Sequence, residues 1–329
     1  MSGTENRRES LFKSKVKPML SKMRGRILQD KYFNAIYLRN IPEITRCLNK
    51  GVNPNVRSSE YGVAPLHLLA ERNDYILGYR LLECKDVNAD LKSVHGYTAL
   101  HIACNFNCKR FVGLLLQKGA DPNLCDRLNK SPLHIAVERE SYGIILKLLK
   151  AKANVNVLDC FENTPLSVGI VNVNNLLIVK TLLQYGVNMS IEHRRSLHIF
   201  FEAILNCRSI NQIDFIMLLL ENGVNINTRE TKTGRNCLHF VAITGYLELA
   251  VVLVQKGAKW NAIDTRYRSP AKVAMEHGNE ILADYFRKGY RPPNLLTTLP
   301  LVYLWTSKLK LRLTEKRAQQ EQGHEHDAK

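Results

Sequence analysis

Residues 98–101 read Thr-Ala-Leu-His, and residues 131–134, 33 positions further on, read Ser-Pro-Leu-His. Both are copies of one tetrapeptide motif. Its other copies and weakened versions begin at residues 64, 164, 195, 236 and 269. Self-similarity at a period of roughly 20 to 50 residues is typical of proteins built from stacked repeats. The sequence therefore predicts a repeat architecture.

Each copy is followed by a helical apolar pattern and then by a phrase such as LLLQKGADPN at residues 114–123. A Thr, Ser or Asn before the apolar run supplies an N-cap oxygen for helix N–H groups that otherwise lack a partner, and Pro suits the first helical turn. A glycine after the second helix, as at Gly119, permits the left-handed turn that ends it. One helix pair cannot bury both of its apolar faces, so neighbouring pairs must stack.

This pattern resembles the ankyrin repeat, whose Thr-Pro-Leu-His signature and period of about 33 residues it matches over residues 30–291. The resemblance implies an all-α repeat solenoid of stacked helix-turn-helix units joined by β-hairpin-like loops. We expect about eight units. The first of them, at residues 30–55, is degenerate and is expected to cap the N-terminal end.

The regular spacing breaks once, between Gly186 and Gly223. The stretch from His198 to Gly223 is longer than its counterparts in the other units, whereas the stretch from Gly186 to His198 is shorter. Two interpretations stay open. A shortened hairpin and a longer first helix or inter-helix loop near residues 206–211 create a distinctive ligand contact or bend, or the loop insertion is simply tolerated.

Five histidines occupy the last position of the motif, a recurrence that argues against one convergent metal cluster. They are His67, His101, His134, His198 and His239. The resemblance implies that each bonds the capping region and the backbone of the adjacent repeat. The chain has no phosphate-binding loop, nucleophile elbow, His-Glu-x-x-His or dinucleotide fingerprint. We expect a non-catalytic protein without a metal or cofactor.

The resemblance also implies that partners lie across the hairpin tips and the concave face of the first helices. Large aromatic and arginine side chains carry much of the binding energy in interfaces. We nominate eight tip residues by position and type alone. They are His95, Tyr97, Arg127, Lys130, Phe161, Arg235, Arg266 and Tyr267.

The formal net charge of +17 is concentrated in the two flanks, because residues 1–26 carry +6 and residues 287–317 carry +7. Residues 1–29 are predicted to form a basic flank that is helical or a disordered arm. Residues 292–313 are apolar and basic, and we expect a C-terminal cap or a docking element there. Residues 314–329 are predicted to be a disordered polar tail.

Three functions remain open on the sequence. The first is a monomeric, non-catalytic interaction module or adaptor that binds another protein. The second is a substrate receptor of a cullin-type ubiquitin ligase, which docks an adaptor through residues 294–313. The third is a regulator that binds nucleic acid or an anionic membrane through its basic flanks.

The sequence also bears on the compartment. The first thirty residues lack a continuous apolar segment, and no stretch approaches the roughly 18 apolar residues of a membrane span, so we predict neither a secretory signal nor a span. Eight cysteines are scattered along the chain rather than gathered in a dense framework. Reduced thiols in the cytoplasm or the nucleus are therefore expected.

Overall fold

The computed structural model describes residues 17–58, 62–189, 192–193, 197–207 and 209–287. The chain divides into two compact units, unit 1 with residues 1–196 and unit 2 with residues 197–329. The predicted C-terminal element at residues 292–313 and the predicted tail at residues 314–329 lie outside the described residues.

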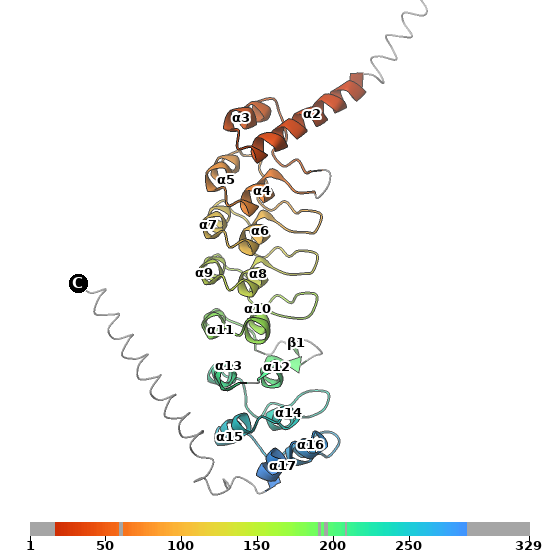
Figure 1. Ribbon diagram of the computed structural model, residues 1–329, viewed down its shortest axis with the longest axis vertical. Helices are drawn as coiled ribbons and strands as arrows, with labels where there is room; N and C mark the ends of the chain where they lie inside the picture. Colours follow the sequence, from red (N-terminus) through yellow and green to blue (C-terminus); the bar gives the residue numbers. More distant parts are fainter. Residues whose placement is uncertain (1–16, 59–61, 190–191, 194–196, 208, 288–329) are drawn as a thin grey trace, which may run out of the picture. The chain divides into compact units, whose positions relative to one another are not determined.

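The described part of unit 1 is a succession of helix pairs followed by a two-residue strand. Its elements are α2 (Lys17–Tyr37) and α3 (Ile41–Asn49), α4 (Pro65–Glu71) and α5 (Tyr75–Leu82), α6 (Ala99–Asn105) and α7 (Lys109–Gln117), α8 (Pro132–Glu138) and α9 (Tyr142–Lys150), α10 (Pro165–Val168), the π-helix η2 (Gly169–Val173) and α11 (Leu176–Leu183), and β1 (Glu192–His193). First helices α4, α6 and α8 form one layer and second helices α5, α7 and α9 another, with the hairpins projecting beyond the first helices (Figure 1).

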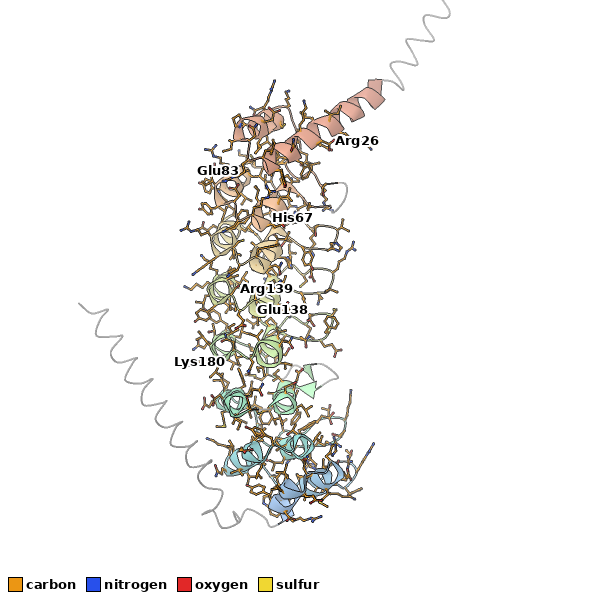
Figure 2. All side chains as sticks on the ribbon, viewed as in Figure 1. Arg26, His67, Glu83, Glu138, Arg139 and Lys180 are labelled. Atoms are coloured by element: carbon orange, nitrogen blue, oxygen red, sulfur yellow. The ribbon has the colours of Figure 1, made fainter. Side chains whose placement is uncertain are left out.

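The α6–α7 pair shows why these residues fold as they do. Helix α6 begins after Thr98, whose hydroxyl oxygen accepts a hydrogen bond from the backbone N–H of His101 at 3.4 Å. This bond pairs one of the N–H groups that a helix leaves open at its start. Asn107, at φ 55°, turns the chain into α7. Leu100 of α6 and Phe111 of α7 are then fully buried. Side chains fill the space between the two layers of helices (Figure 2).

Helix α2 runs through the expected boundary between the basic flank and the repeats at residues 29 and 30. Its C-terminal half is part of the core, since Tyr32 and Ile36 are buried and the helix packs on α3. One turn earlier, Ile27 is 54% exposed. The first repeat thus provides the packing that holds this part of the helix, and residues 1–16 lie outside the described part of the chain.

Unit 2 contains the remaining described elements. They are β2 (Leu197–His198), α12 (Ile199–Asn206), α13 (Ile210–Glu221), α14 (Cys237–Thr244), α15 (Leu247–Gln255), α16 (Pro270–Glu276) and α17 (Glu280–Arg287). The first helices α12, α14 and α16 pack in order on one another, and each packs on its own second helix (Figure 1). The predicted all-α repeat of stacked helix pairs is confirmed.

The irregular repeat differs from its prediction. Helix α12 begins after His198, which is its N-cap residue, so the motif at residues 195–198 is not the equivalent of the other tetrapeptides. The stretch from Gly186 to the cap His198 is as long as the stretch from Gly119 to the cap Ser131. The predicted shortened hairpin is therefore wrong. The predicted longer first helix or loop amounts to one residue, because α12 has 8 residues against 7 in α6 and the caps His198 and Ser209 lie one position further apart than Thr98 and Cys108. Most of the extra residues extend the second helix, α13, to 12 residues, against 8 or 9 in α5, α7, α9 and α15.

A second, smaller irregularity lies in the repeat before it. The stretch between the N-caps Thr164 and Asn175 is one residue longer than the stretch between the N-caps Ser131 and Ser141. The π-helix η2 accommodates this additional residue, because a π-turn holds one more residue than an α-turn. The sequence carries the signal, since the distance along the chain from the end of the motif to the terminating glycine is also one residue longer here than in other repeats.

Candidate functional site

Four of the five motif histidines share one geometry. In His101, Nδ1 accepts a hydrogen bond from the backbone N–H of Thr98 at 3.1 Å, so Nε2 carries the proton and donates to the carbonyl oxygen of Lys130 at 3.1 Å. The equivalent carbonyls are those of Tyr97 for His67, Asn163 for His134 and Arg268 for His239. Each of these histidines connects its own helix cap to the hairpin of the following repeat. Both ring nitrogens are engaged, which leaves neither for a metal.

Burial keeps these histidines neutral. The ring of His101 is fully buried, and desolvation lowers its pKa from 6.5 to about 4. Burial likewise lowers the pKa of His67, His134 and His239. A neutral imidazole with a protonated Nε2 is the form that this hydrogen-bond pattern requires. Their role in the described structure is to hold neighbouring repeats together.

His198 has a different position from the other four. As the N-cap residue of α12, it accepts a hydrogen bond at Nδ1 from the backbone N–H of Phe200 at 3.1 Å. Phe201 is the third residue of α12, the position that His101 occupies in α6. Phe201 is fully buried and stacks on Phe240 of α14, with ring centroids 4.6 Å apart. In this repeat an aromatic contact replaces the histidine bond.

The hairpin tips are shaped by an aspartate that the sequence interpretation did not single out. One carboxylate oxygen of Asp126 accepts hydrogen bonds from the backbone N–H groups of Leu128 and Lys130, both at 2.8 Å. Asp159 and Asp264 bind their own hairpins in the same way. The available signal is an aspartate five residues before the helix cap, as with Asp126 and Ser131.

The eight nominated residues fall into two groups. The side chains of five are exposed on the tips, namely His95, Arg127, Phe161, Arg266 and Tyr267. The other three, Tyr97, Lys130 and Arg235, are partly buried. Neighbouring tips of unit 1 are joined through the backbone, because Arg127 N donates to His95 O at 3.2 Å and Cys160 N to Leu128 O at 2.8 Å. This bonding fixes the spacing of the exposed side chains.

Tyr97 and Lys130 meet in a groove of about 220 Å³ between the hairpins and the first helices α6 and α8. Its apolar lining includes Ile102 and Leu128, and Leu128 is 45% exposed. Its polar lining includes the ion pair of Lys130 with Glu138. The groove thus combines apolar contact area with a polar rim, a combination that suits a side chain of another protein. Sequence reasoning missed Ile102 and Glu138, which lie in the first helices α6 and α8 after the motif.

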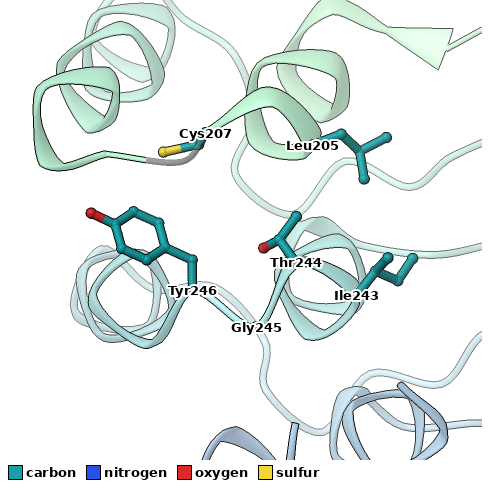
Figure 3. Close-up of a pocket in the computed structure, with 6 residues that line it drawn as sticks. All are labelled: Leu205, Cys207, Ile243, Thr244, Gly245 and Tyr246. Atoms are coloured by element: carbon teal, nitrogen blue, oxygen red, sulfur yellow. The ribbon is translucent and has the colours of Figure 1, made fainter. Parts of the chain in front are cut away.

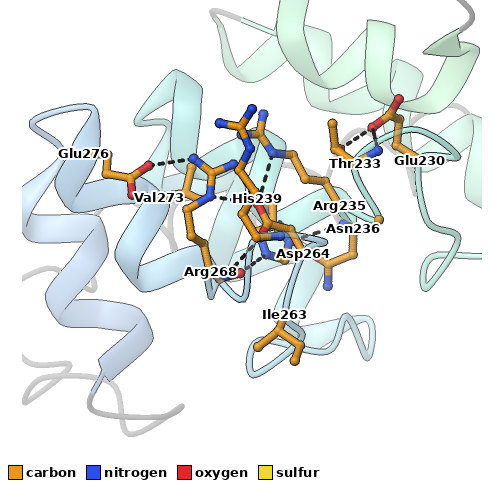
Figure 4. A network of polar contacts seen from close by, with 12 residues as sticks. Glu230, Thr233, Arg235, Asn236, His239, Ile263, Asp264, Arg268, Val273 and Glu276 are labelled. Carbon is orange, nitrogen blue, oxygen red and sulfur yellow. Dashed lines mark hydrogen bonds and ion pairs between the residues drawn. The ribbon is translucent and has the colours of Figure 1, made fainter.

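Unit 2 has a densely charged tip around Asp264 (Figure 4). The carboxylate of Asp264 is fully buried and forms an ion pair with Arg268 at 2.8 Å, and Arg268 also reaches Glu276 at 2.9 Å. At the apex, Tyr267 is 83% exposed and has a left-handed backbone at φ 56°. Bulky residues seldom adopt this conformation, which glycine tolerates and which Gly96 and Gly234 adopt at equivalent apices.

Unit 2 also contains a hollow, of about 470 Å³. It lies where the turn from α12 to α13 faces the turn from α14 to α15 (Figure 3). Cys207 and Tyr246 line it. Burial raises the pKa of the Cys207 thiol to about 11 and that of the Tyr246 phenol to about 12. Both groups are protonated near neutral pH, so the thiol is not an activated nucleophile.

Two further properties of the described part of the chain concern metal ions and membranes. No group of three or more His, Cys, Asp or Glu side chains is arranged there to hold a metal ion. None of the described helices has the length and apolar character needed to cross a membrane.

Comparison with known proteins finds ankyrin repeats in both units. A three-copy ankyrin-repeat model matches residues 33–126 and 111–193, and a second ankyrin-repeat model matches residues 204–254. The B-cell lymphoma 3 protein homolog of Mus musculus is 27% identical over 225 residues, which make up 66% of this chain and 49% of that protein. SH3 and multiple ankyrin repeat domains protein 2 of Homo sapiens is 23% identical over 268 residues, 82% of this chain and 12% of that protein.

Solved structures show the same fold. The ankyrin repeat domain of Bcl-3 matches with a TM-score of 0.61 and 24% identity, over 68% of this chain and all of that domain. The ankyrin repeat domain of human ASB11 matches with a TM-score of 0.54 and 21% identity, over 68% of this chain and 98% of that domain. At this identity the likeness concerns the fold. The chain spans about half or less of the length of the two curated relatives above.

Proposed function

Because this chain belongs to the ankyrin-repeat family, whose repeats are protein–protein interaction modules, we propose that it binds a partner protein through its hairpin tips and the adjoining first-helix groove. The ankyrin fold is typically non-catalytic. The proposal makes this chain a binding module that performs no chemistry on its partner. Its partner-binding residues include the eight nominated tip residues together with Leu128 and Ile102.

The groove of unit 1 is the observation that carries this proposal. It offers the apolar side chains of Ile102 and Leu128 beside a charged rim, and it opens next to tips that carry exposed apolar residues. Val94 is 43% exposed and Phe161 is 53% exposed. Exposed apolar groups of this kind, fixed by backbone bonds between tips, lose little conformational entropy when a partner covers them.

Paired substitutions test the proposal. Leu128→Asp with Phe161→Asp places two charges on the tips without altering buried side chains. The matched control is Leu177→Asp, because Leu177 is 55% exposed but lies on the second helix α11. Full-length proteins are compared by quantitative affinity purification, and their melting curves are recorded to verify folding.

We expect at least one protein that binds the wild type and the control variant to bind the double variant at least about tenfold less. Buried charge opposite an apolar partner surface costs more than about 1.4 kcal/mol, which corresponds to that factor. If every partner is recovered equally with the folded double variant, the tips of unit 1 are not the binding surface.

The two alternative functions rest on other parts of the chain. The ligase-receptor hypothesis depends on residues 294–313, which lie outside the described residues. The hypothesis of nucleic-acid or membrane binding depends on the basic flanks, of which residues 17–29 are described. Both stay predictions from the sequence.

A further inference from the structure

The tip of unit 2 contains a carboxylate that has no capacity left for another donor. One oxygen of Asp264 accepts the backbone N–H groups of Arg266 and Arg268, both at 2.9 Å. The other accepts two guanidinium N–H groups of Arg268, at 3.0 and 2.8 Å. Burial alone would raise the pKa of Asp264, but the hydrogen bonds from Arg268 and Arg266 outweigh it and lower the pKa to about 2. Asp264 is therefore an anion whose lone pairs are all engaged.

Arg235 lies beside this saturated carboxylate. Its Nε is 3.6 Å from Asp264 Oδ2, which is an ionic contact but too long for a hydrogen bond. This Nε is buried and has no hydrogen-bond partner among the described residues. The side chain of Arg235 keeps 18% of its surface exposed. Since Nε is enclosed, only the two Nη groups can donate to a ligand that approaches from solvent, and they make no hydrogen bond among the described residues (Figure 4).

The hairpins that carry Arg235 and Asp264 are bonded to each other. Thr265 N donates to Thr233 O at 2.8 Å, and Arg229 Nη1 donates to Ile263 O at 2.9 Å. Residues 229–235 and 263–268 therefore form one bonded surface, which we call the unit 2 tip.

Charge at the unit 2 tip is unbalanced. Its cations are Arg229, Lys232, Arg235, Arg266 and Arg268. Its anions are Glu230, Asp264 and, through its bond to Arg268, Glu276. Five positive and three negative charges leave an excess of two. A phosphate monoester carries about 1.5 to 2 negative charges at neutral pH and accepts the paired N–H groups of a guanidinium.

We propose that the unit 2 tip binds a phosphorylated side chain on a partner protein, with the two Nη groups of Arg235 as the paired donors and the exposed Arg266 as the second cation. Tyr267, fully presented at the apex, contacts the residues that flank the phosphate. This inference rests on the proposed function, since it names the chemical group that a partner presents at one set of tips. A carboxylate offers half the charge and is the weaker ligand of the same surface.

Peptide binding to the full-length chain tests this inference. The probes are fluorescein-labelled heptapeptide pools of random sequence with phosphoserine, serine or glutamate at the centre, together with a labelled single-stranded DNA of seven nucleotides. Fluorescence anisotropy is measured for the wild type, Arg235→Ala, Arg235→Lys and Lys180→Ala. Lys180 is an exposed cation on α11 in unit 1 and provides the charge-matched control (Figure 2).

The expected result is that the phosphoserine pool binds at least about tenfold more tightly than the serine and glutamate pools. Arg235→Ala should abolish this preference, and Arg235→Lys should reduce it at least about threefold, because lysine keeps the charge but not the paired donors. Lys180→Ala should leave it unchanged.

Three outcomes would overturn the proposal. They are equal binding of the phosphoserine and glutamate pools, equal losses in the Arg235 and Lys180 variants, and DNA binding as tight as that of the phosphoserine pool. The Leu128 and Phe161 substitutions concern the surface of unit 1, whereas this experiment concerns unit 2 and needs no natural partner. Failure of one test is therefore distinguishable from failure of the other.

Discussion

In unit 1 the first helices α6 and α8 are connected through a buried histidine, whereas in unit 2 the first helices α12 and α14 are connected through two stacked phenylalanines. His101 donates to the carbonyl oxygen of Lys130, which also accepts the backbone N–H of Asp126. At the equivalent position, Phe201 offers no donor and lies 4.6 Å from Phe240, ring centre to ring centre.

The consequence appears in the hairpin that follows. In unit 2 the carbonyl oxygen of Arg235 is the equivalent of Lys130 O in unit 1. It accepts a hydrogen bond from the backbone N–H of Glu230. The histidine bond is absent there because Phe201 has replaced the histidine. The third position of a first helix can thus join neighbouring repeats by a hydrogen bond or by an aromatic contact. We expect the two contacts to respond differently to mutation and to pH.

The largest expected effect concerns the aromatic connection. Phe201→Ala removes a fully buried ring and should lower the free energy of unfolding by about 3–5 kcal/mol. Phe201→His should cost less, since its Nε2 can donate to Arg235 O as His101 does to Lys130 O. Urea unfolding of both variants measures the difference. Equal losses would show that the position in α12 cannot form the histidine bond.

The second effect distinguishes the two connections by pH. His101 has a pKa of about 4 when folded and about 6.5 when unfolded, so the unfolded chain takes up protons first as the pH falls. Its stabilising contribution is complete above about pH 6.5 and is lost as the pH falls towards 4. At pH 5 the loss from His101 amounts to about 2 kcal/mol.

A glutamine variant isolates this contribution. Gln at the third helix position also bonds back to the cap, but it does not titrate. His101→Gln should therefore lose less stability than the wild type between pH 7.5 and pH 5.0, by urea unfolding at both values. The same pH dependence in both proteins would contradict the assignment of the low pKa to His101.

The regular part of the fold could be predicted from the sequence because cap, helix and terminating glycine recur at fixed spacing. The irregular repeat could not be placed correctly, since residues 195–198 imitate the motif while the helix begins three residues later. A buried phenylalanine gives no sequence signal that distinguishes it from other core residues. The position of Phe201 therefore required the three-dimensional structure.

The candidate site was predictable to a similar degree. Hairpin position alone predicted the exposure of Phe161 and Tyr267. It did not predict that Arg235 is oriented beside Asp264, because that contact joins two hairpins and depends on Asp264 being saturated by its own loop. Contacts between neighbouring repeats are tertiary, and the spacing within one repeat does not determine them.

Tyr267→Gly has the smallest expected effect on stability and tests the use of the hairpin tips most directly. Glycine adopts the left-handed backbone without strain, so the variant should be more stable than the wild type by about 1 kcal/mol in urea unfolding. The same variant should bind the phosphoserine pool, and the partners recovered with the wild type, at least about threefold more weakly. We expect higher stability together with weaker binding. If the variant binds both the phosphoserine pool and the partners as tightly as the wild type, the hairpin tips are not the binding surface.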